Sequence, residues 1–248
     1  KATCPWRITA AVYQELEEGD ADALDTYYRL VRSQGARDFR DNLRVRTLDS
    51  AQTTSAGSLA CVREAVEQMG QDERFVLIAG PGVALARGWD EIAVKEWEAA
   101  RSATHVSDPV VTHHPARIAS GGGGAAPPSF VGNLLAGSSS AVGNLTHDGV
   151  ALGNDRPRST FTVLQPFRHA APRVSSASFP HTVREKPTRC IAACVDNAFM
   201  ETELLSRALD REAFAAPIAR YAADAAFSSA LWDSGARFVS PTGTLAWS

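Results

Sequence analysis

The chain has 248 residues, of which 44% are hydrophobic, and a formal net charge of -3. This length corresponds to one large domain, or a domain with a long appendage, and the apolar content suffices for a substantial core. The slightly negative charge excludes a global basic field directed at nucleic acid or an anionic membrane. No apolar run reaches the ~20 residues of a membrane span. The start, without Met or a signal peptide, favours a mature or trimmed product, and no compartment is indicated.

The first half of the chain alternates between strand and helix patterns. Ile8, Ala10 and Val12 lie on one face at strand period, whereas Tyr27 and Val31 follow a helical spacing. The expected strands are residues 7–13, 43–48, 74–78 and 109–113, and the expected helices are residues 20–35, 55–70 and a segment that begins at Asp90. The order β-α-β-α-β-α-β predicts an α/β fold with a mainly parallel sheet that helices cover on both faces.

The middle of the chain differs in composition. Residues 120–144 are rich in Gly, Ser, Pro and Ala, and the run SGGGG lacks the Lys-Ser/Thr ending of a phosphate loop, so we expect a flexible insertion. Residues 156–189 contain several prolines and are expected to be loop-rich. Regular structure is expected again from residue 188, with a helix that Gly235 ends and a short strand at residues 237–241.

The stretch FVLIAGPGVALARGWDE joins a buried strand to a helix through the turn Gly80-Pro81-Gly82. A dinucleotide-binding turn would have its third glycine at Leu85, and Pro81 removes a backbone N–H that could bind phosphate. The favoured interpretation is therefore a tight strand-to-helix turn, which carries no carboxylate, histidine, serine or cysteine.

Two pairs of side chains resemble metal ligands only weakly. Cys190 and Cys194 are not accompanied by a second Cys/His pair at zinc spacing, so buried free thiols are favoured. His113 and His114 follow an expected strand, where ligands bind in open α/β sheets. Adjacent strand residues point to opposite faces, which favours a structural or exposed pair over a shared metal.

Two isolated carboxylates remain as candidates. Asp49 directly follows an expected strand, where it would hydrogen-bond a ribose or another hydroxylated ligand, or else form a helix-entry turn. Asp224 lies among alanines in an expected helix, where small neighbours would let a ligand approach closely; a surface position is the favoured alternative.

Six stretches outside residues 117–188 resemble, in order, the GT-A glycosyltransferases of the polypeptide N-acetylglucosaminyltransferase type, which attach the sugar to protein hydroxyls. They are CPWRITAAVYQE, DALDTYY, LRVRTLDSAQTTSAGSLACVREAV, ERFVLIAGPGVALARGWDE, VVTHHP and YAADAAFSSALWDSGARFVSP. The fourth looks like the family pattern EYYLQIDSHxxFxxGWDE and ends in a matched Gly88-Trp89-Asp90-Glu91. The third keeps the family's arginine as Arg63.

The resemblance implies a GT-A (Rossmann-like) fold. Residues 1–116 would form the nucleotide-sugar-binding half, residues 117–188 a Gly/Ser/Pro-rich insertion, and residues 189–248 the acceptor-side half of the same domain. It also implies UDP-GlcNAc as donor, with Mn²⁺ or Mg²⁺ held on the diphosphate by an Asp-x-His/Asp motif. Such a metal neutralises the charge that develops on the leaving UDP.

The sequence departs from the family pattern where this chemistry would occur. The Asp-Ser-His triplet falls within residues 79–82, AGPG, so no ligand remains, and the family's Gly-Glu-Glu falls at YAADAA, which keeps only Asp224. We therefore expect no metal site and no cofactor. The remaining candidates for donor contact are Asp49, Arg63 and Arg87.

The leading hypothesis is a pseudo-glycosyltransferase that serves as a structural or interaction subunit of a larger assembly. The alternative is an active, metal-independent UDP-sugar transferase that modifies protein hydroxyls, for which Asp49, Asp90 and Asp224 are the candidate carboxylates. A third hypothesis is an unrelated nucleotide-binding α/β protein. The partners expected for the leading hypothesis are other protein subunits, with local RNA contact through the arginines of residues 32–46.

Overall fold

The computed structural model describes residues 2–16, 19–34, 38–49, 58–68, 72–80, 83–104, 106–113, 159–165, 173–179, 186–210, 223–242 and 246–247. Its helices are the 3-10 turns η1 (Pro5–Arg7) and η2 (Arg40–Asn42), and α1 (Ala23–Gln34), α2 (Ser58–Glu67), α3 (Trp89–Thr104), α5 (Thr202–Leu209) and α6 (Ala223–Asp233). Its strands are β1 (Ala10–Leu16), β2 (Leu43–Asp49), β3 (Phe75–Ala79), β4 (Ala84–Leu85), β5 (Pro109–Thr112), β6 (Ser159–Gln165), β7 (Arg173–Phe179), β8 (Thr188–Arg189), β9 (Asn197–Glu201), β10 (Arg237–Ser240) and β11 (Ala246–Trp247).

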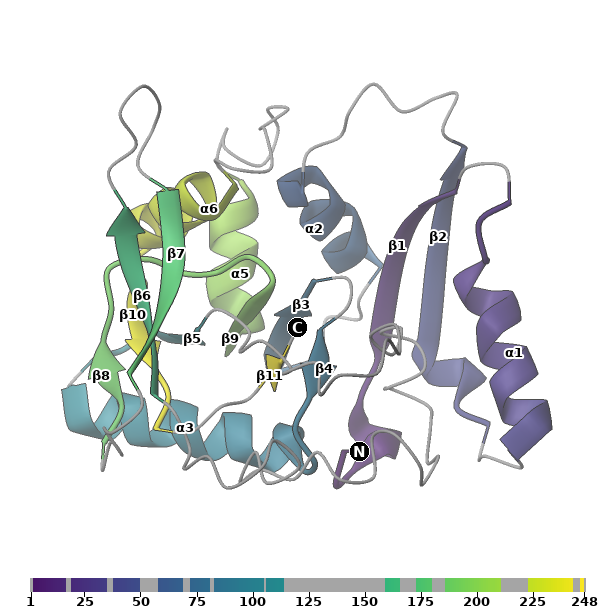
Figure 1. Cartoon of the computed structure of the whole chain (residues 1–248), viewed down its shortest axis with the longest axis horizontal. Coiled ribbons are helices and arrows are strands. Elements are labelled where there is room, and N and C mark those ends of the chain that lie inside the picture. The colour runs from purple at the N-terminus through teal and green to yellow at the C-terminus, as the bar shows by residue number, and fades with distance from the viewer. Residues whose placement is uncertain are drawn as a thin grey trace.

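A five-stranded sheet in the order β3-β9-β5-β10-β8 forms the centre of the molecule (Figure 1). β9 is antiparallel to both β3 and β5, so these two strands run in the same direction, and β10 runs parallel to β5. β8 is antiparallel to β10 at the sheet edge. The predicted α/β class is confirmed, but the sheet is mixed rather than mainly parallel. The difference arises because β9 returns from the C-terminal part of the chain and inserts between β3 and β5.

Helices cover both faces of this sheet because successive strand residues point to opposite sides. Val76, Val110 and Phe238 belong to the larger core cluster, together with apolar residues of α2, α5 and α6. Their neighbours Leu77, Val111 and Val239 pack with Ala93, Trp97 and Ala100 of α3. The result is three layers, with α3 on one face of the sheet and α2, α5 and α6 on the opposite face (Figure 1).

The predicted alternation of strands and helices in the first half is confirmed. β1 and β2 form a separate parallel pair that runs from Ala10 opposite Leu43 to Leu16 opposite Asp49, with α1 as their connection. α1 begins where Asp22 accepts the N–H groups of Leu24 (2.6 Å) and Asp25 (3.1 Å), as expected for an aspartate at a helix start.

The second half both confirms and corrects the expectations. α6 is followed by Gly235 with φ 99, a conformation that favours glycine, and β10 follows as predicted. Residues 156–189 were expected to be loop-rich, yet β6 and β7 form an antiparallel pair from Ser159 opposite Phe179 to Gln165 opposite Arg173. Residues 120–144 lie outside the described residues. No described helix is long and apolar enough to cross a membrane.

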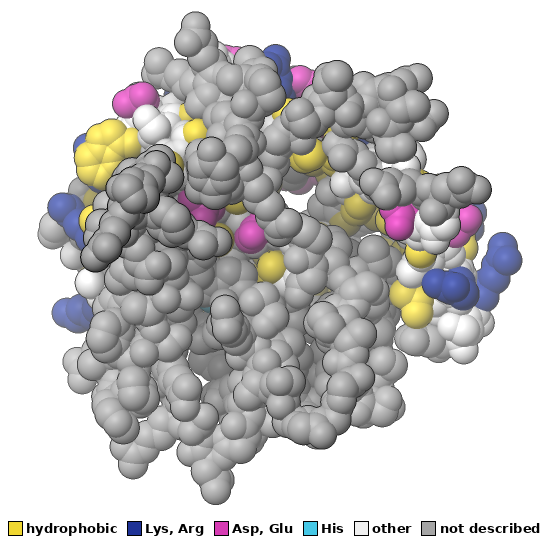
Figure 2. All heavy atoms as spheres, turned by 45° about the horizontal axis from the view of Figure 1, so that its top comes forward, with side chains coloured by type: hydrophobic (Ala, Val, Ile, Leu, Met, Phe, Trp, Pro, Cys, Tyr) yellow, Lys and Arg dark blue, Asp and Glu magenta, His cyan; other side chains and the backbone are white. Residues whose placement is uncertain are grey.

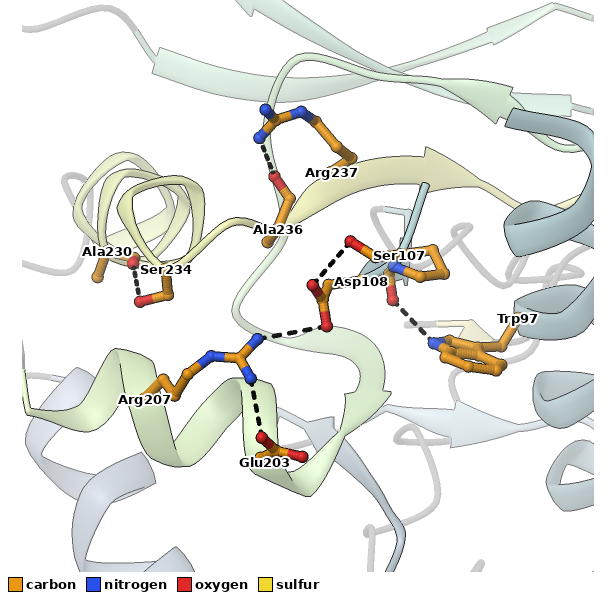
Figure 3. Close-up of polar contacts among 10 residues, drawn as sticks. Trp97, Ser107, Asp108, Glu203, Arg207, Ala230, Ser234, Ala236 and Arg237 are labelled. Atoms are coloured by element: carbon orange, nitrogen blue, oxygen red, sulfur yellow. Dashed lines mark hydrogen bonds and ion pairs between the residues drawn. The ribbon is translucent and has the colours of Figure 1, made fainter. Parts of the chain in front are cut away.

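Polar contacts join the helices α3 and α5 and the strand β10 to the amino end of β5 (Figure 3). Asp108 accepts from the guanidinium of Arg207 on α5 at 3.3 Å and, through its carbonyl, from the N–H of Arg237 at 3.1 Å. The indole N–H of Trp97 donates to the Pro109 carbonyl at 2.9 Å. Because Trp97 is only 1% exposed, this bond fixes α3 against the sheet from within the core.

We expect Trp97→Ala to lower the free energy of unfolding by about 3–5 kcal/mol, since it leaves a cavity between α3 and the sheet. Trp97→Phe should cost about 1–2 kcal/mol, because the ring stays but the bond to Pro109 is lost. Urea unfolding measures both. Trp6→Ala is the control, as Trp6 is 56% exposed and its removal should cost under ~0.5 kcal/mol. Equal losses for Trp97→Ala and Trp6→Ala would contradict this assignment of the core.

Candidate functional site

The segment at residues 193–197, here called the 193–197 turn, lies at the carboxyl ends of β3 and β5. The N–H of Cys194 donates to Thr112 Oγ1 at 2.9 Å, and the same hydroxyl donates to the Asn197 carbonyl at 2.8 Å. The Asn197 side-chain amide donates to the His113 carbonyl at 3.0 Å. Thr112, His113 and Asn197 are all almost fully buried, so the turn is fixed to β5 from inside the protein.

The same turn is fixed to the first turns of α6. The N–H of Ala193 donates to Ser228 Oγ at 2.8 Å, and the N–H of Val195 donates to Asp224 Oδ1 at 2.7 Å. A carboxylate that accepts a backbone N–H bond makes a strong, charge-assisted contact. The sequence candidate Asp224 therefore lies at this site, where it positions the turn.

Gly80, directly after β3, packs against Asp196 of the turn. The Gly80 N–H donates to the Asp196 carbonyl at 2.9 Å. A Cβ atom on Gly80 would lie 2.7 Å from the Asp196 Cβ and closer still to its carboxyl group. A side chain at position 80 therefore has no room while Asp196 is in place. Pro81 and Gly82 lie outside the described residues.

Electrostatics at the turn disfavour a reactive thiol. Burial raises the pKa of the Cys194 thiol above its usual range, and the carboxylates of Asp224 and Asp196 raise it further. The thiolate is the nucleophile and the metal ligand, so this cysteine stays in its inert form. All four cysteines of the chain are free thiols.

Asp90, the carboxylate of the matched Gly88–Glu91 segment, binds the start of the chain. Its two oxygens accept the N–H groups of Thr3 at 2.8 Å and Cys4 at 2.9 Å. Gly88 has φ 69, and a Cβ atom there would lie 3.3 Å from Thr3 Oγ1. The segment thus begins α3 and holds the N-terminal residues against this helix. Gly88 and Asp90 therefore both have a structural role.

Of the other sequence candidates, His113 contacts the 193–197 turn through its carbonyl, whereas Arg63, Arg87 and Asp49 belong to other segments. Arg63 is exposed on α2, where it pairs with Glu67 at 3.3 Å. Arg87 is exposed just before α3. Asp49 ends β2, in the separate β1–β2 pair, and its side chain lies outside the description. His113 is buried (1% exposed), whereas His114 is outside the described residues.

Asp196 is the residue that the sequence did not single out. It lies in the stretch CVDNAF, immediately before β9. The available signal was a turn-forming Asp-Asn pair ahead of an apolar run. Its importance depends on the antiparallel pairing of β9 with β3, which sets Asn197 opposite Ala79 and so brings Asp196 beside Gly80.

The residues around β3 do not fit the divalent metal that the family resemblance implies. A carboxylate at position 80 would collide with Asp196, and hard cations need oxygen ligands arranged around an open position. Within the described part of the chain, no group of three or more His, Cys, Asp or Glu side chains could hold a metal ion. The Asp224 carboxylate accepts the Val195 N–H and so positions the turn, and Asp196 belongs to the turn itself.

The arginines of residues 32–46 are partly engaged with carboxylates. Arg40 pairs with Asp38 at 2.9 Å, and Arg46 pairs with Glu64 on α2. Figure 2 shows that Lys and Arg side chains visible on this face stand at separate places, with acidic side chains among them. The arginines of β2 therefore serve in part to join that strand to α2.

Comparison of the chain with protein-family models, with curated proteins and with solved structures found no match.

Thr112→Val tests the attachment of the turn to β5. Valine has the same shape but leaves the Cys194 N–H without its partner, so we expect a loss of about 1–3 kcal/mol in unfolding free energy. Thr112→Ser keeps the hydroxyl and should cost under ~1 kcal/mol for the missing methyl group. Urea unfolding separates the two variants. If the serine variant were as unstable as the valine variant, the hydroxyl would not be the anchor.

Gly80→Ala tests the contact with Asp196. We expect a loss of about 1–3 kcal/mol, because the added methyl group overlaps the Asp196 side chain. Asp196→Gly removes the overlapping atoms and completes a double-mutant cycle. The loss of unfolding free energy in the double variant should be smaller, by at least ~0.5 kcal/mol, than the summed losses of the two single variants. Additive losses would show that the two residues do not compete for one space.

Proposed function

We propose that this chain is a pseudo-glycosyltransferase with a GT-A-like fold, which acts as a structural or interaction subunit of a larger assembly. One observation carries the proposal: the space after β3, where the family resemblance implies metal ligands, is closed by the packing of Gly80 against Asp196. In open α/β sheets the ligand crevice lies at the carboxyl ends of the strands. Here the 193–197 turn occupies that end of β3 and β5.

The location of the resembling segments supports the GT-A-like part of the proposal. They contribute α2, β3, β5 and α6 followed by β10 to the three layers, and β1 and β2 to the separate parallel pair. A sheet in which β3, β5 and β10 run in one direction accommodates such a nucleotide-binding half. The resemblance to the family therefore lies in the strands and helices that build the domain.

The use of the candidate carboxylates supports the loss of catalysis. Asp90 binds two backbone N–H groups of the N-terminal segment, and Asp224 binds that of Val195. A general base or a metal ligand needs to approach substrate or cation. Both carboxylates instead satisfy backbone donors whose loss would destabilise the fold.

An active, metal-independent transferase is the second candidate. The observation that favours it is the proximity of two carboxylates, Asp196 within the 193–197 turn and Asp224 on α6, to the Cys194 thiol. A carboxylate pair at a strand end is the kind of group that activates an acceptor hydroxyl. UDP-GlcNAc would be the donor under this alternative, without Mn²⁺ or Mg²⁺.

Calorimetric titration of the full chain with UDP-GlcNAc, with and without Mn²⁺, tests the proposal. We expect no binding tighter than a Kd of about 1 mM in either condition, since the space for the diphosphate metal is closed. A metal-dependent glycosyltransferase titrated in parallel shows that the measurement detects binding. Metal-dependent binding would overturn the pseudoenzyme.

Metal-independent binding would favour the second candidate, and a turnover assay with Asp196→Asn and Asp224→Asn would follow. Under that candidate at least one of the two variants should lose ~10²-fold or more of the activity. Under the pseudoenzyme proposal no turnover exists for the variants to change.

A further inference from the structure

An exposed tryptophan at the end of α6 carries an arginine on the face of its ring. Trp232 is 50% exposed, although its ring centroid lies 6.1 Å from that of Phe238, a member of the larger core cluster. The guanidinium carbon of Arg237, at the start of β10, lies 4.3 Å from the centroid of the Trp232 ring. A cation in this position is attracted by the indole face. The two side chains therefore hold each other in place on the surface.

A second exposed apolar side chain lies at the same edge of the sheet. The Cys190 N–H donates to the Phe238 carbonyl at 2.9 Å, which continues the antiparallel pairing of β8 with β10. Ile191 follows directly and is 57% exposed. The same pairing, continued by one residue, sets Ile191 opposite Arg237. Trp232, Arg237 and Ile191 are here called the α6–β10 patch.

The α6–β10 patch offers hydrogen-bond donors and has no side-chain acceptor. A guanidinium carries five N–H donors in a planar fork, and that of Arg237 donates through Nη1 to the Ala236 carbonyl at 2.8 Å (Figure 3). Among the described residues no carboxylate pairs with Arg237, and none accepts from the Trp232 indole N–H. Arg207, by contrast, pairs with two carboxylates. The donors of the patch therefore suit an external carboxylate, which accepts a guanidinium fork through both oxygens.

The charges around the patch favour one carboxylate over a polyanion. The exposed Asp233 follows Trp232 directly, and Asp108 and Glu203 surround Arg207 at the same end of the sheet (Figure 3). These acidic groups oppose the strongly positive field on which nucleic-acid binding depends. The indole ring and the neighbouring isoleucine suit an apolar side chain beside the bound carboxylate.

We propose that the α6–β10 patch is a docking site for a partner protein segment that carries an Asp or Glu next to a large apolar residue. The carboxylate binds the outward donors of Arg237, and the apolar residue packs on Trp232 and Ile191. Trp and Arg are the residue types that most often dominate the binding energy of protein interfaces. The inference rests on the proposed function as an interaction subunit and names the surface that it would use.

The order of the patch favours binding of such a segment. Phe238, beside the Trp232 ring, is only 2% exposed, so the ring rests on the core, and its contact with Arg237 fixes both side chains. Anchors that are already ordered lose less conformational entropy on binding. A second copy of this chain is a poorer occupant, because a twofold contact through the patch would bring two Arg237 charges together.

Selection of a random peptide library on the immobilised full-length chain tests the proposal. We expect the enriched peptides to carry an Asp or Glu beside a large aliphatic or aromatic residue. The consensus peptide is then synthesised with a fluorescent label, together with a neutral version in which Asn or Gln replaces the acidic residue. In fluorescence anisotropy the acidic peptide should bind at least ~10-fold more tightly than the neutral one.

Trp232→Ala and Arg237→Gln should each weaken binding of the consensus peptide at least ~10-fold. Trp6→Ala and Arg29→Gln are the matched controls, since both side chains are exposed on other elements, and they should bind as the wild type does. Circular dichroism and urea unfolding establish that each variant is folded. If a patch variant does not fold, Ile191→Ser and Arg237→Lys replace it. Lysine keeps the charge without the planar fork, and each replacement should weaken binding at least ~3-fold.

Failure to enrich any peptide, equal binding of the acidic and neutral peptides, or undiminished binding to the folded patch variants would overturn the proposal. A labelled single-stranded RNA provides the comparison with a polyanion. If Arg237→Gln abolished RNA binding while no peptide bound, nucleic acid would be the occupant, and the proposal would also be wrong. Binding of UDP-GlcNAc in the calorimetric titration would overturn the proposed function while leaving the peptide result unaffected.

Discussion

The 193–197 turn is the constraint on which the rest of the structure depends. Its buried N–H groups need acceptors, since an unsatisfied buried donor costs about 1–3 kcal/mol. Thr112, Asp224 and Ser228 supply side-chain acceptors from β5 and α6. These three bonds fix the turn immediately before β9, and β9 lies antiparallel between β3 and β5.

The same bonds decide what space is left for a ligand. The carboxyl ends of β3 and β5 would form the crevice of an open α/β sheet, but the turn fills them, and Asp196 packs against Gly80. A side chain whose acceptor atom already binds a backbone N–H group is not available to bind a substrate with that atom.

The sequence predicted the elements whose signal is local. The helical spacing of Tyr27 and Val31, the apolar run at β3 and the glycine after α6 all correspond to observed elements. It did not predict the direction of β9 or the strands β6 and β7, because strand pairing between distant segments leaves no local period. Gly80 was identified as part of a turn without functional groups. The reason for the glycine, its contact with Asp196, is tertiary and became visible only with the register of β9.

The Gly88–Glu91 segment has a structural role at the start of α3. Gly88 adopts a conformation that favours glycine, and Asp90 binds the N–H groups of Thr3 and Cys4. Further along α3, Glu96 binds the other end of the chain through Thr242. α3 thus holds both terminal segments with carboxylates that point at backbone donors. Substitution of Asp90 would therefore release the N-terminal segment from α3, because the Thr3 and Cys4 N–H groups would lose their acceptor.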